Sequence, residues 1–332
     1  MIVHLPDTTT NAVAKALVKI REEGGAVALG RVLTLIIATP LGEEEEAIEA
    51  ANDASREHPM RVIVLSKHPD GRQREAARLD AEIRVGGDAG ASEVIVLRAY
   101  GDTAADEEGL VTGLLLPDAP VVAWWPSNAP VSPSRSPLGK IAQRRITDAA
   151  AATNPLQALE SLGAHYSPGD TDFAWTRLTL WRAQLAAVRD QPPFEPVLGV
   201  RVAGSSDSPS TELLAAWLQQ QLDVPVSLDI TNPIHGSSGI HGVKLDRASG
   251  EINLERLRPN IATLTQPNQP THDISLPRRN LRDCLAEELR RLDPDDLFGE
   301  VVQDGLGALS APAMKNRPGP GKDRGPKSRS KA

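Results

Sequence analysis

Hydrophobic and polar positions in the first part of the chain alternate between strand-like and helix-like spacing. Residues 31–39 and 60–66 are nearly continuous runs of β-branched and aliphatic side chains, which is typical of strands covered on both faces. Residues 43–57, between them, are rich in Glu and Ala and begin with four acids. They predict a helix, because negative charge is favourable at a helix N-terminus. This strand, helix, strand order predicts a parallel α/β unit.

The pattern continues up to residue 190. Residues 79–85 and 93–100 are bounded by turn residues and predict an antiparallel pair at the edge of the sheet. Three prolines within residues 191–196 then indicate a domain boundary. We therefore expect a mostly parallel α/β domain over residues 1–190. Its other predicted elements are a strand over 120–125 and helices over 11–23, 102–116, 155–162 and 176–190.

The next part of the chain predicts a smaller α/β domain over residues 191–307. Residues 240–265 contain three short alternating segments separated by turn residues, which indicate an antiparallel meander. Around it the spacing predicts strands over 197–203, 224–230 and 272–276, and helices over 210–222, 280–292 and 293–302. In the helix over 280–292, an apolar face forms around Cys284, Leu285 and Leu289, and Glu288 is expected outside it.

Composition separates the body of the chain from its end. The 332 residues carry a formal net charge of -8, which disfavours a body that binds nucleic acid. From Lys315 onward, however, seven Lys and Arg residues and one Asp are mixed with Gly, Pro and Ser. Such a segment cannot build a core, so we expect residues 308–332 to form a disordered basic tail. Any nucleic-acid contact is expected to be non-specific and confined to this tail.

The cysteine content indicates a reducing compartment, and the hydropathy indicates neither a membrane span nor a secretory signal. Cys284 is the single cysteine of the sequence, so an intrachain disulfide is impossible and thiol-rich metal sites are excluded. No apolar run is long enough to span a bilayer, and residues 1–10 do not resemble a secretory signal. We expect a cytoplasmic protein that does not bind membranes.

One stretch, residues 169–182, concentrates aromatic and charged side chains. It contains Trp175, Arg177, Trp181 and Arg182. Arg and Trp are the residues most enriched at protein interfaces, because each combines contact area with a directional donor. If the stretch is helical, Arg177 and Trp181 are four apart and share a face. The alternative is that the tryptophans belong to the core and the arginines pair with neighbouring aspartates.

Two loops could bind small ligands. Gly204, Ser205, Ser206 and Ser208 lie between a predicted strand and a predicted helix, where backbone N–H groups and hydroxyls can bind an anion. The loop matches neither a dinucleotide fingerprint nor a P-loop, and an ordinary serine-capped helix explains it as well.

The second loop carries His235 and His241, six residues apart, which match no compact zinc pattern. We therefore predict no metal and no cofactor. Nucleophile motifs are absent from the sequence, which points away from an enzyme.

Four segments together resemble the glucose 6-phosphate dehydrogenase assembly proteins, the OpcA family. They are Trp124-Trp125-Pro126, residues 142–148 with sequence AQRRITD, residues 170–182 with the Trp-Thr-Arg and Trp-Arg pairs, and residues 285–295 with sequence LAEELRRLDPD. The resemblance extends to about residue 305 in its actinobacterial form and excludes the tail. Leu180 stands where the family motif leads us to expect proline, which affects the helix start more than the assignment.

The resemblance implies a non-catalytic protein that binds glucose 6-phosphate dehydrogenase, promotes its active oligomer and so acts as an allosteric activator in the oxidative pentose phosphate pathway. Such a partner would act by binding the active conformation more tightly. Two alternatives stay open: a sugar-phosphate-binding enzyme using residues 204–208, and a nucleic-acid-associated protein acting through the tail. The residues expected to bind the dehydrogenase are Trp124, Trp125, Arg144, Arg145, Asp172, Trp175, Arg177, Trp181 and Arg182.

Overall fold

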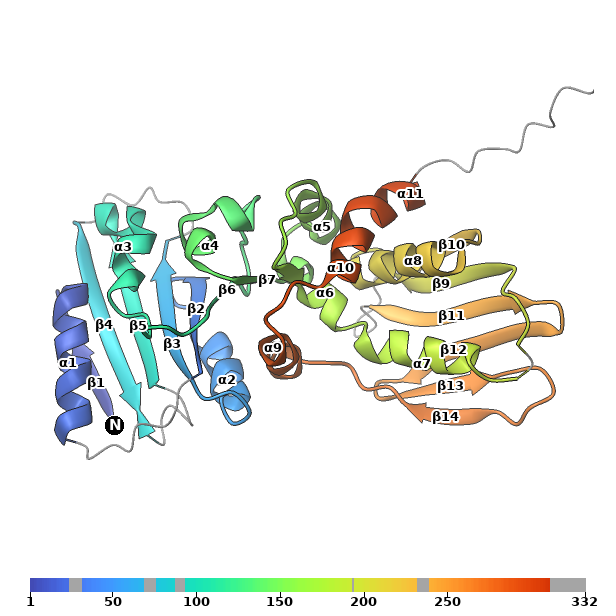
Figure 1. The fold of residues 1–332 in the computed structure, drawn as a ribbon, viewed down its shortest axis with the longest axis horizontal. Coiled ribbons are helices and arrows are strands. Elements are labelled where there is room, and N and C mark those ends of the chain that lie inside the picture. The colour runs from blue at the N-terminus through green and yellow to red at the C-terminus, as the bar shows by residue number, and fades with distance from the viewer. Residues whose placement is uncertain (24–31, 69–75, 87–92, 193, 232–238, 311–332) are drawn as a thin grey trace, which may run out of the picture.

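The computed structural model describes residues 1–23, 32–68, 76–86, 93–192, 194–231 and 239–310. Within these ranges the strands form two sheets, one of eight strands and one of six, that lie side by side (Figure 1). The expected class, a mostly parallel α/β sheet followed by a smaller mixed sheet, is confirmed. The expected basic tail lies outside the described residues from residue 311 onward, and residues 308–310 belong to the last helix.

The first sheet has the order β1-β4-β5-β3-β2-β6-β7-β8 and is parallel from β5 to β8. The expected antiparallel pair is β4 and β5, and β1 adds an edge strand that the sequence pattern does not predict. β7 and β8 are also unpredicted, because they are short and polar. The strands are β1 Ile2–Leu5, β2 Leu33–Pro40, β3 Met60–Lys67, β4 Arg78–Val85, β5 Glu93–Tyr100, β6 Val121–Trp124, β7 Arg144–Thr147 and β8 Asp170–Asp172.

Helices cover both faces of this sheet. α1 and α3 share one apolar cluster with the sheet, and α2 shares another on the opposite face. A single helix over residues 102–116 is not found: a 3-10 turn, Gly101–Ala105, precedes the shorter α3, whose first turn is capped by the Asp106 carboxylate. The helices are α1 Thr10–Glu23, α2 Glu45–Ala54, α3 Glu107–Thr112, α4 Pro137–Ile141 and α5 Pro155–Ala164, with further 3-10 turns at Pro133–Arg135 and Ala149–Ala151.

The second sheet has the order β10-β9-β11-β12-β13-β14. β9 and β10 are parallel and are connected by α8, Pro209–Leu222, whereas β11 to β14 form the expected antiparallel meander. Valine, leucine and isoleucine side chains of alternate positions on these strands pack beneath the helices. The strands are β9 Gly199–Ser205, β10 Val226–Thr231, β11 Ile240–Arg247, β12 Gly250–Arg258, β13 Ile261–Thr265 and β14 His272–Ser275.

Each sheet is covered partly by a helix from the other half of the sequence. α6, Phe173–Thr176, and α7, Thr179–Arg189, were expected to close the first domain, but Trp175, Trp181 and Leu185 pack in the core of the second sheet. Conversely α9, Leu281–Arg290, packs against α2 of the first domain (Figure 1). The cores therefore do not separate at residue 190. The chain then ends its described part with α10 Asp296–Glu300, a π turn Val301–Gly305 and α11 Leu306–Ser310.

Candidate functional site

The first sheet reverses its strand order between β2 and β6, which is where doubly wound α/β sheets bind dinucleotides. A crevice of about 700 Å³ lies here, and Glu43, Glu45 and Glu46 are among its lining residues. The turn that leads into α2 has a single glycine, Gly42, with φ of 87°. A dinucleotide pyrophosphate needs a glycine-rich turn and free N–H groups at this point. The crevice instead presents negative charge, which is unfavourable for a phosphate.

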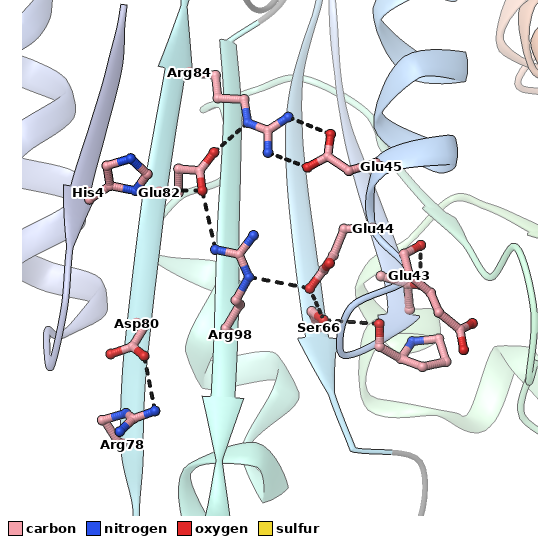
Figure 2. A network of polar contacts seen from close by, with 12 residues as sticks. His4, Glu43, Glu44, Glu45, Ser66, Arg78, Asp80, Glu82, Arg84 and Arg98 are labelled. Carbon is pink, nitrogen blue, oxygen red and sulfur yellow. Dashed lines mark hydrogen bonds and ion pairs between the residues drawn. The ribbon is translucent and has the colours of Figure 1, made fainter.

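An arginine of β4 holds one of these glutamates, Glu45, in place (Figure 2). Arg84 of β4 binds both carboxylate oxygens of Glu45, at 2.6 and 2.9 Å. Its hydrogen bond lowers the pKa of Glu45 below the usual value. Glu44, one of the four acids at the start of the expected helix, is buried and accepts a 2.6 Å hydrogen bond from the Ser66 hydroxyl. The acidic turn is therefore a fixed part of the fold.

A buried polar cluster joins the two halves of the molecule. Glu288 of α9 is only 6% exposed, and its carboxylate pairs with the Arg144 guanidinium of β7. The same carboxylate accepts a 2.5 Å hydrogen bond from the Thr176 hydroxyl of α6. Arg144 also donates to the backbone carbonyl of Asp293, at 2.8 Å. Glu288 thus connects β7, α6 and α9, and its expected place on the outer face of α9 is wrong.

Two adjacent acids lie beside this cluster. Asp148 accepts two hydrogen bonds of 2.7 Å from the Arg177 guanidinium, which is a bidentate pair. Asp172, at the end of β8, is fully buried and accepts hydrogen bonds from the Thr147 hydroxyl and from the backbone N–H groups of Ala149 and Ala174. Burial, followed by repulsion from Asp148, raises the pKa of Asp172 to about 6.

Because of Asp172, the free energy of unfolding is expected to fall as the pH rises from about 4 to about 6. With its pKa raised from 3.8 to about 6, the folded state keeps a proton that the unfolded chain has already lost. Because the folded state binds more protons in this window, the free energy of unfolding falls as pH rises. Asp172→Asn removes this titration, so the wild type should lose stability relative to the variant across the window.

Chemical unfolding of both proteins at several pH values measures this difference. The amide nitrogen of Asn donates where one carboxylate oxygen of Asp172 accepts, so the comparison concerns the slope with pH and not the absolute free energy. Parallel curves for the two proteins would contradict the expectation.

The tryptophans of the predicted partner-binding set lie in the interior. Trp124 packs against Phe173 with ring centroids 5.6 Å apart, and Trp125 is buried beside it in the chain. Trp175 is 1% exposed, and its Nε1–H donates a 2.8 Å hydrogen bond to the Asp295 carboxylate. Trp181 is equally buried in the core of the second sheet. Their positions agree with the alternative interpretation, that these side chains build the core.

The arginines of the same set are largely engaged within the chain. Arg144 and Arg145 are buried, and Arg145 pairs with Asp170 and donates to the carbonyl of Ala142 at 2.9 Å. Arg182 stacks over the Trp175 ring at 3.7 Å, and burial lowers its pKa. Of the nine predicted partner-binding residues, only Arg177 and Arg182 are not buried. Whether any of them contacts the dehydrogenase stays a prediction.

A second cavity, of about 360 Å³, opens at the start of α8. It is lined by Arg177, Arg256, Arg278 and Arg279, and by Ser208 and Ser210 at the helix N-terminus. Ser208 caps the helix by accepting from the N–H of Thr211, and Pro209 follows at the first helical position. Gly204 is needed close by, because a Cβ there would lie 2.2 Å from the Thr211 hydroxyl.

Of the four residues predicted to bind an anion, only Ser208 is therefore among the described residues that line this cavity. Ser208 lines it, whereas the Ser205 hydroxyl donates to Asp207 and Ser206 donates its N–H to the carbonyl of Thr231. The arginines that share the cavity come from other segments. Of the two histidines in the second candidate loop, His235 lies outside the described residues and His241 lies on β11. In the described part of the chain, no group of three or more His, Cys, Asp or Glu side chains is placed to hold a metal ion.

The sequence pattern does not predict that Glu288, Asp148 and Asp295 lie where the two halves meet. It also does not predict that Arg256 lines the cavity at the start of α8. A signal existed for Glu288, because it follows Leu285 by three positions and so lies on the same helical face. Arg256 lies on the same face of β12 as the buried Ile252 and Leu254, but the alternation along the strand does not indicate a cavity. No described helix is long or apolar enough to cross a membrane.

Several solved structures share a distant similarity with the chain. A 3-ketoreductase from Actinomadura kijaniata, in complex with NADP, is 9% identical, with a TM-score of 0.47 over 82% of this chain and 95% of that one. An oxidoreductase from Sinorhizobium meliloti is 12% identical, with a TM-score of 0.49 over 83% and 94%. These TM-scores are below 0.5, so we draw no conclusion from them. A search of curated protein sequences gives no significant match.

Family profiles give a specific result. The profile of the glucose-6-phosphate dehydrogenase subunit N-terminal domain matches residues 51–164, and that of the C-terminal domain matches residues 168–302. The two profiles meet just before β8, so they divide the chain ahead of the expected boundary at residue 190. Together they include the segments that meet at the Glu288 cluster. The chain therefore belongs to the OpcA family of glucose-6-phosphate dehydrogenase assembly proteins.

Proposed function

We propose that this protein is a non-catalytic subunit that binds glucose-6-phosphate dehydrogenase and stabilises its active oligomer, acting as an allosteric activator in the cytoplasm. The observation that carries the proposal is the match of both family profiles, which name a subunit of this dehydrogenase. An activator of this kind needs no turnover of its own. It needs only a higher affinity for the active conformation than for the inactive one.

The acidic crevice supports the non-catalytic part of the proposal. Three glutamates line the place where a dinucleotide pyrophosphate would bind, and the turn contains one glycine. Arg84 fixes Glu45 in this arrangement. Binding of NADP at this point would require the pyrophosphate to replace these pairs or to lie against uncompensated carboxylates.

The residues expected to bind the dehydrogenase then divide into two groups. We propose that Arg177 and Arg182, which retain some exposure, are the members able to contact the partner directly. The buried members, including Trp175 and Arg144, act by holding the two sheets in one relative position. A surface that spans both sheets depends on this position even where the buried side chains do not touch the partner.

Mixing the purified full chain with the dehydrogenase of the same organism tests the proposal. We expect the two proteins to elute together in size-exclusion chromatography with light scattering, and the initial rate of NADP reduction to rise until a fixed molar ratio is reached. The chain by itself should reduce no NADP in the presence of glucose 6-phosphate. Separate elution with an unchanged rate, or turnover by the chain without the dehydrogenase, would overturn the proposal.

A further inference from the structure

The cavity at the start of α8 lies between segments of both halves of the molecule. Arg177 and Ala150 reach it from the first half, Arg256 from β12, and Arg278 and Arg279 from the connection between β14 and α9. Four of its lining side chains are guanidinium groups, and Asp207 is the carboxylate among the described lining residues. The positive end of the α8 dipole adds to this potential, since Ser208 and Ser210 line the same space.

Arg177 and Arg279 form ion pairs with carboxylates of the chain. Arg177 forms the bidentate pair with Asp148, and Arg279 pairs with Glu287 and donates to the Thr176 carbonyl at 3.0 Å. These pairs hold the guanidinium groups in fixed orientations along the cavity wall. They also offset the charge, so Arg177 and Arg279 shape the cavity more than they supply net attraction.

Arg256 differs from both. Among the described residues, no carboxylate lies within ion-pair distance of its guanidinium. Its Nη2 donates a 2.9 Å hydrogen bond to the Leu276 carbonyl, the group lies 5.0 Å from the Trp181 ring centroid, and its Nε is buried without a partner. Burial, followed by repulsion from Arg278, lowers the pKa of Arg256 to about 10. A bound anion beside the Arg256 guanidinium would offset the cost of burying its charge.

The remaining lining indicates what kind of anion fits. Inorganic phosphate alone would leave much of the 360 Å³ empty. Trp181, Ile240 and Pro277 supply apolar contact area, and the Asp207 carboxylate can accept hydrogen bonds from hydroxyl groups. Guanidinium forks and a helix N-terminus are the groups that bind phosphate oxygens best, because they offer several directed donors.

We propose that this cavity binds a phosphate monoester of a small hydroxylated molecule, with the phosphate between Arg256, Arg278 and the first turn of α8. Gly239 leaves room for this arrangement, because it has φ of 97° and a Cβ there would lie 3.2 Å from Nη1 of Arg278. Because both halves of the molecule line the cavity, binding of a phosphorylated sugar would depend on their relative position. It does not require the chain to be an enzyme or to bind the dehydrogenase.

Isothermal titration calorimetry on the full chain without dehydrogenase tests the site, with glucose 6-phosphate as the probe and glucose and inorganic phosphate as comparisons. We expect saturable binding of the ester, weaker binding of inorganic phosphate and none of glucose. Arg256→Gln should weaken the ester by about tenfold to hundredfold, the effect of losing charge-assisted hydrogen bonds. Arg258→Gln is the matched control, because Arg258 lies on the same strand, is 58% exposed and pairs with Asp273. It should leave the affinity unchanged.

Several results would overturn the proposal. These are no heat of binding with millimolar ester, equal affinity for the ester and for inorganic phosphate, or equal losses in Arg256→Gln and Arg258→Gln. If Arg256→Gln does not fold, Arg278→Gln provides the same test from the other side of the phosphate. Quenching of Trp181 fluorescence on titration gives a second readout, since this ring lines the cavity. Complex formation with the dehydrogenase is measured separately, so failure of one proposal does not imply failure of the other.

Discussion

Glu288→Ala is expected to lower the free energy of unfolding by about 3–5 kcal/mol, the cost typical of breaking a buried ion pair. The substitution leaves the buried Arg144 guanidinium without its carboxylate and removes the acceptor of the Thr176 hydroxyl. Because these groups come from β7, α6 and α9, the loss affects the contact between the two halves as well as one helix. Urea unfolding followed by circular dichroism measures the change.

Two further variants separate this effect from a general effect of removing charge. Glu288→Gln keeps the shape and the hydrogen-bonding oxygen but loses the charge, so we expect an intermediate loss. Glu57→Ala breaks the ion pair of Glu57 with Arg290 at the end of α9, in which the side chains are 56% and 65% exposed. It should cost at most about 1 kcal/mol. A similar loss in Glu57→Ala and Glu288→Ala would contradict the assignment of Glu288 as the central group.

Trp175→Ala is also expected to cost about 3–5 kcal/mol, as a large-to-small substitution in a core. Its ring packs against Phe298 with centroids 5.7 Å apart, and the Arg182 guanidinium stacks over the ring at 3.7 Å from its centroid. The indole N–H is bonded to Asp295. Truncation would therefore open a cavity, unstack an arginine and leave Oδ2 of Asp295 without its donor.

Trp175→Phe is the matched variant for this substitution. It keeps most of the ring contacts and loses the hydrogen bond to Asp295, so about 1–2 kcal/mol is expected. If Trp175→Ala left the melting temperature unchanged but abolished binding of the dehydrogenase, the side chain would belong to an interface and not to the core. The two variants measured together by calorimetry decide between these outcomes.

The sequence predicts elements better where local patterns decide them. β2 and β3 are long β-branched runs and were predicted within two residues of their observed bounds, and the meander followed from alternation and turns. β7 and β8 have the sequences RRIT and DTD, and they become strands because buried partners satisfy their charges. No local pattern contains that information.

The same limit applies to the candidate site. Residues 169–182 stand out in the sequence by their aromatic and charged side chains, but an amphipathic helix does not indicate which of two sheets its apolar face will cover. The burial of Trp181 thus depends on strands that follow it by eighteen or more residues in the chain. Arg256 becomes part of a cationic cavity only through the return of the chain from β14 to α9. Both features are decided by long-range packing.

The packing of α9 on α2 has a consequence for how the chain acquires its structure during synthesis. Ala47, Ala50, Ala51 and Ala54 of α2 are buried together with residues of α9, which follow them by more than two hundred positions. A ribosome must therefore translate almost the whole described chain before the first sheet can cover that face. Domains that are continuous in sequence often fold while the rest of the chain is still being made. Here the N-terminal half completes its core only when the C-terminal half has emerged.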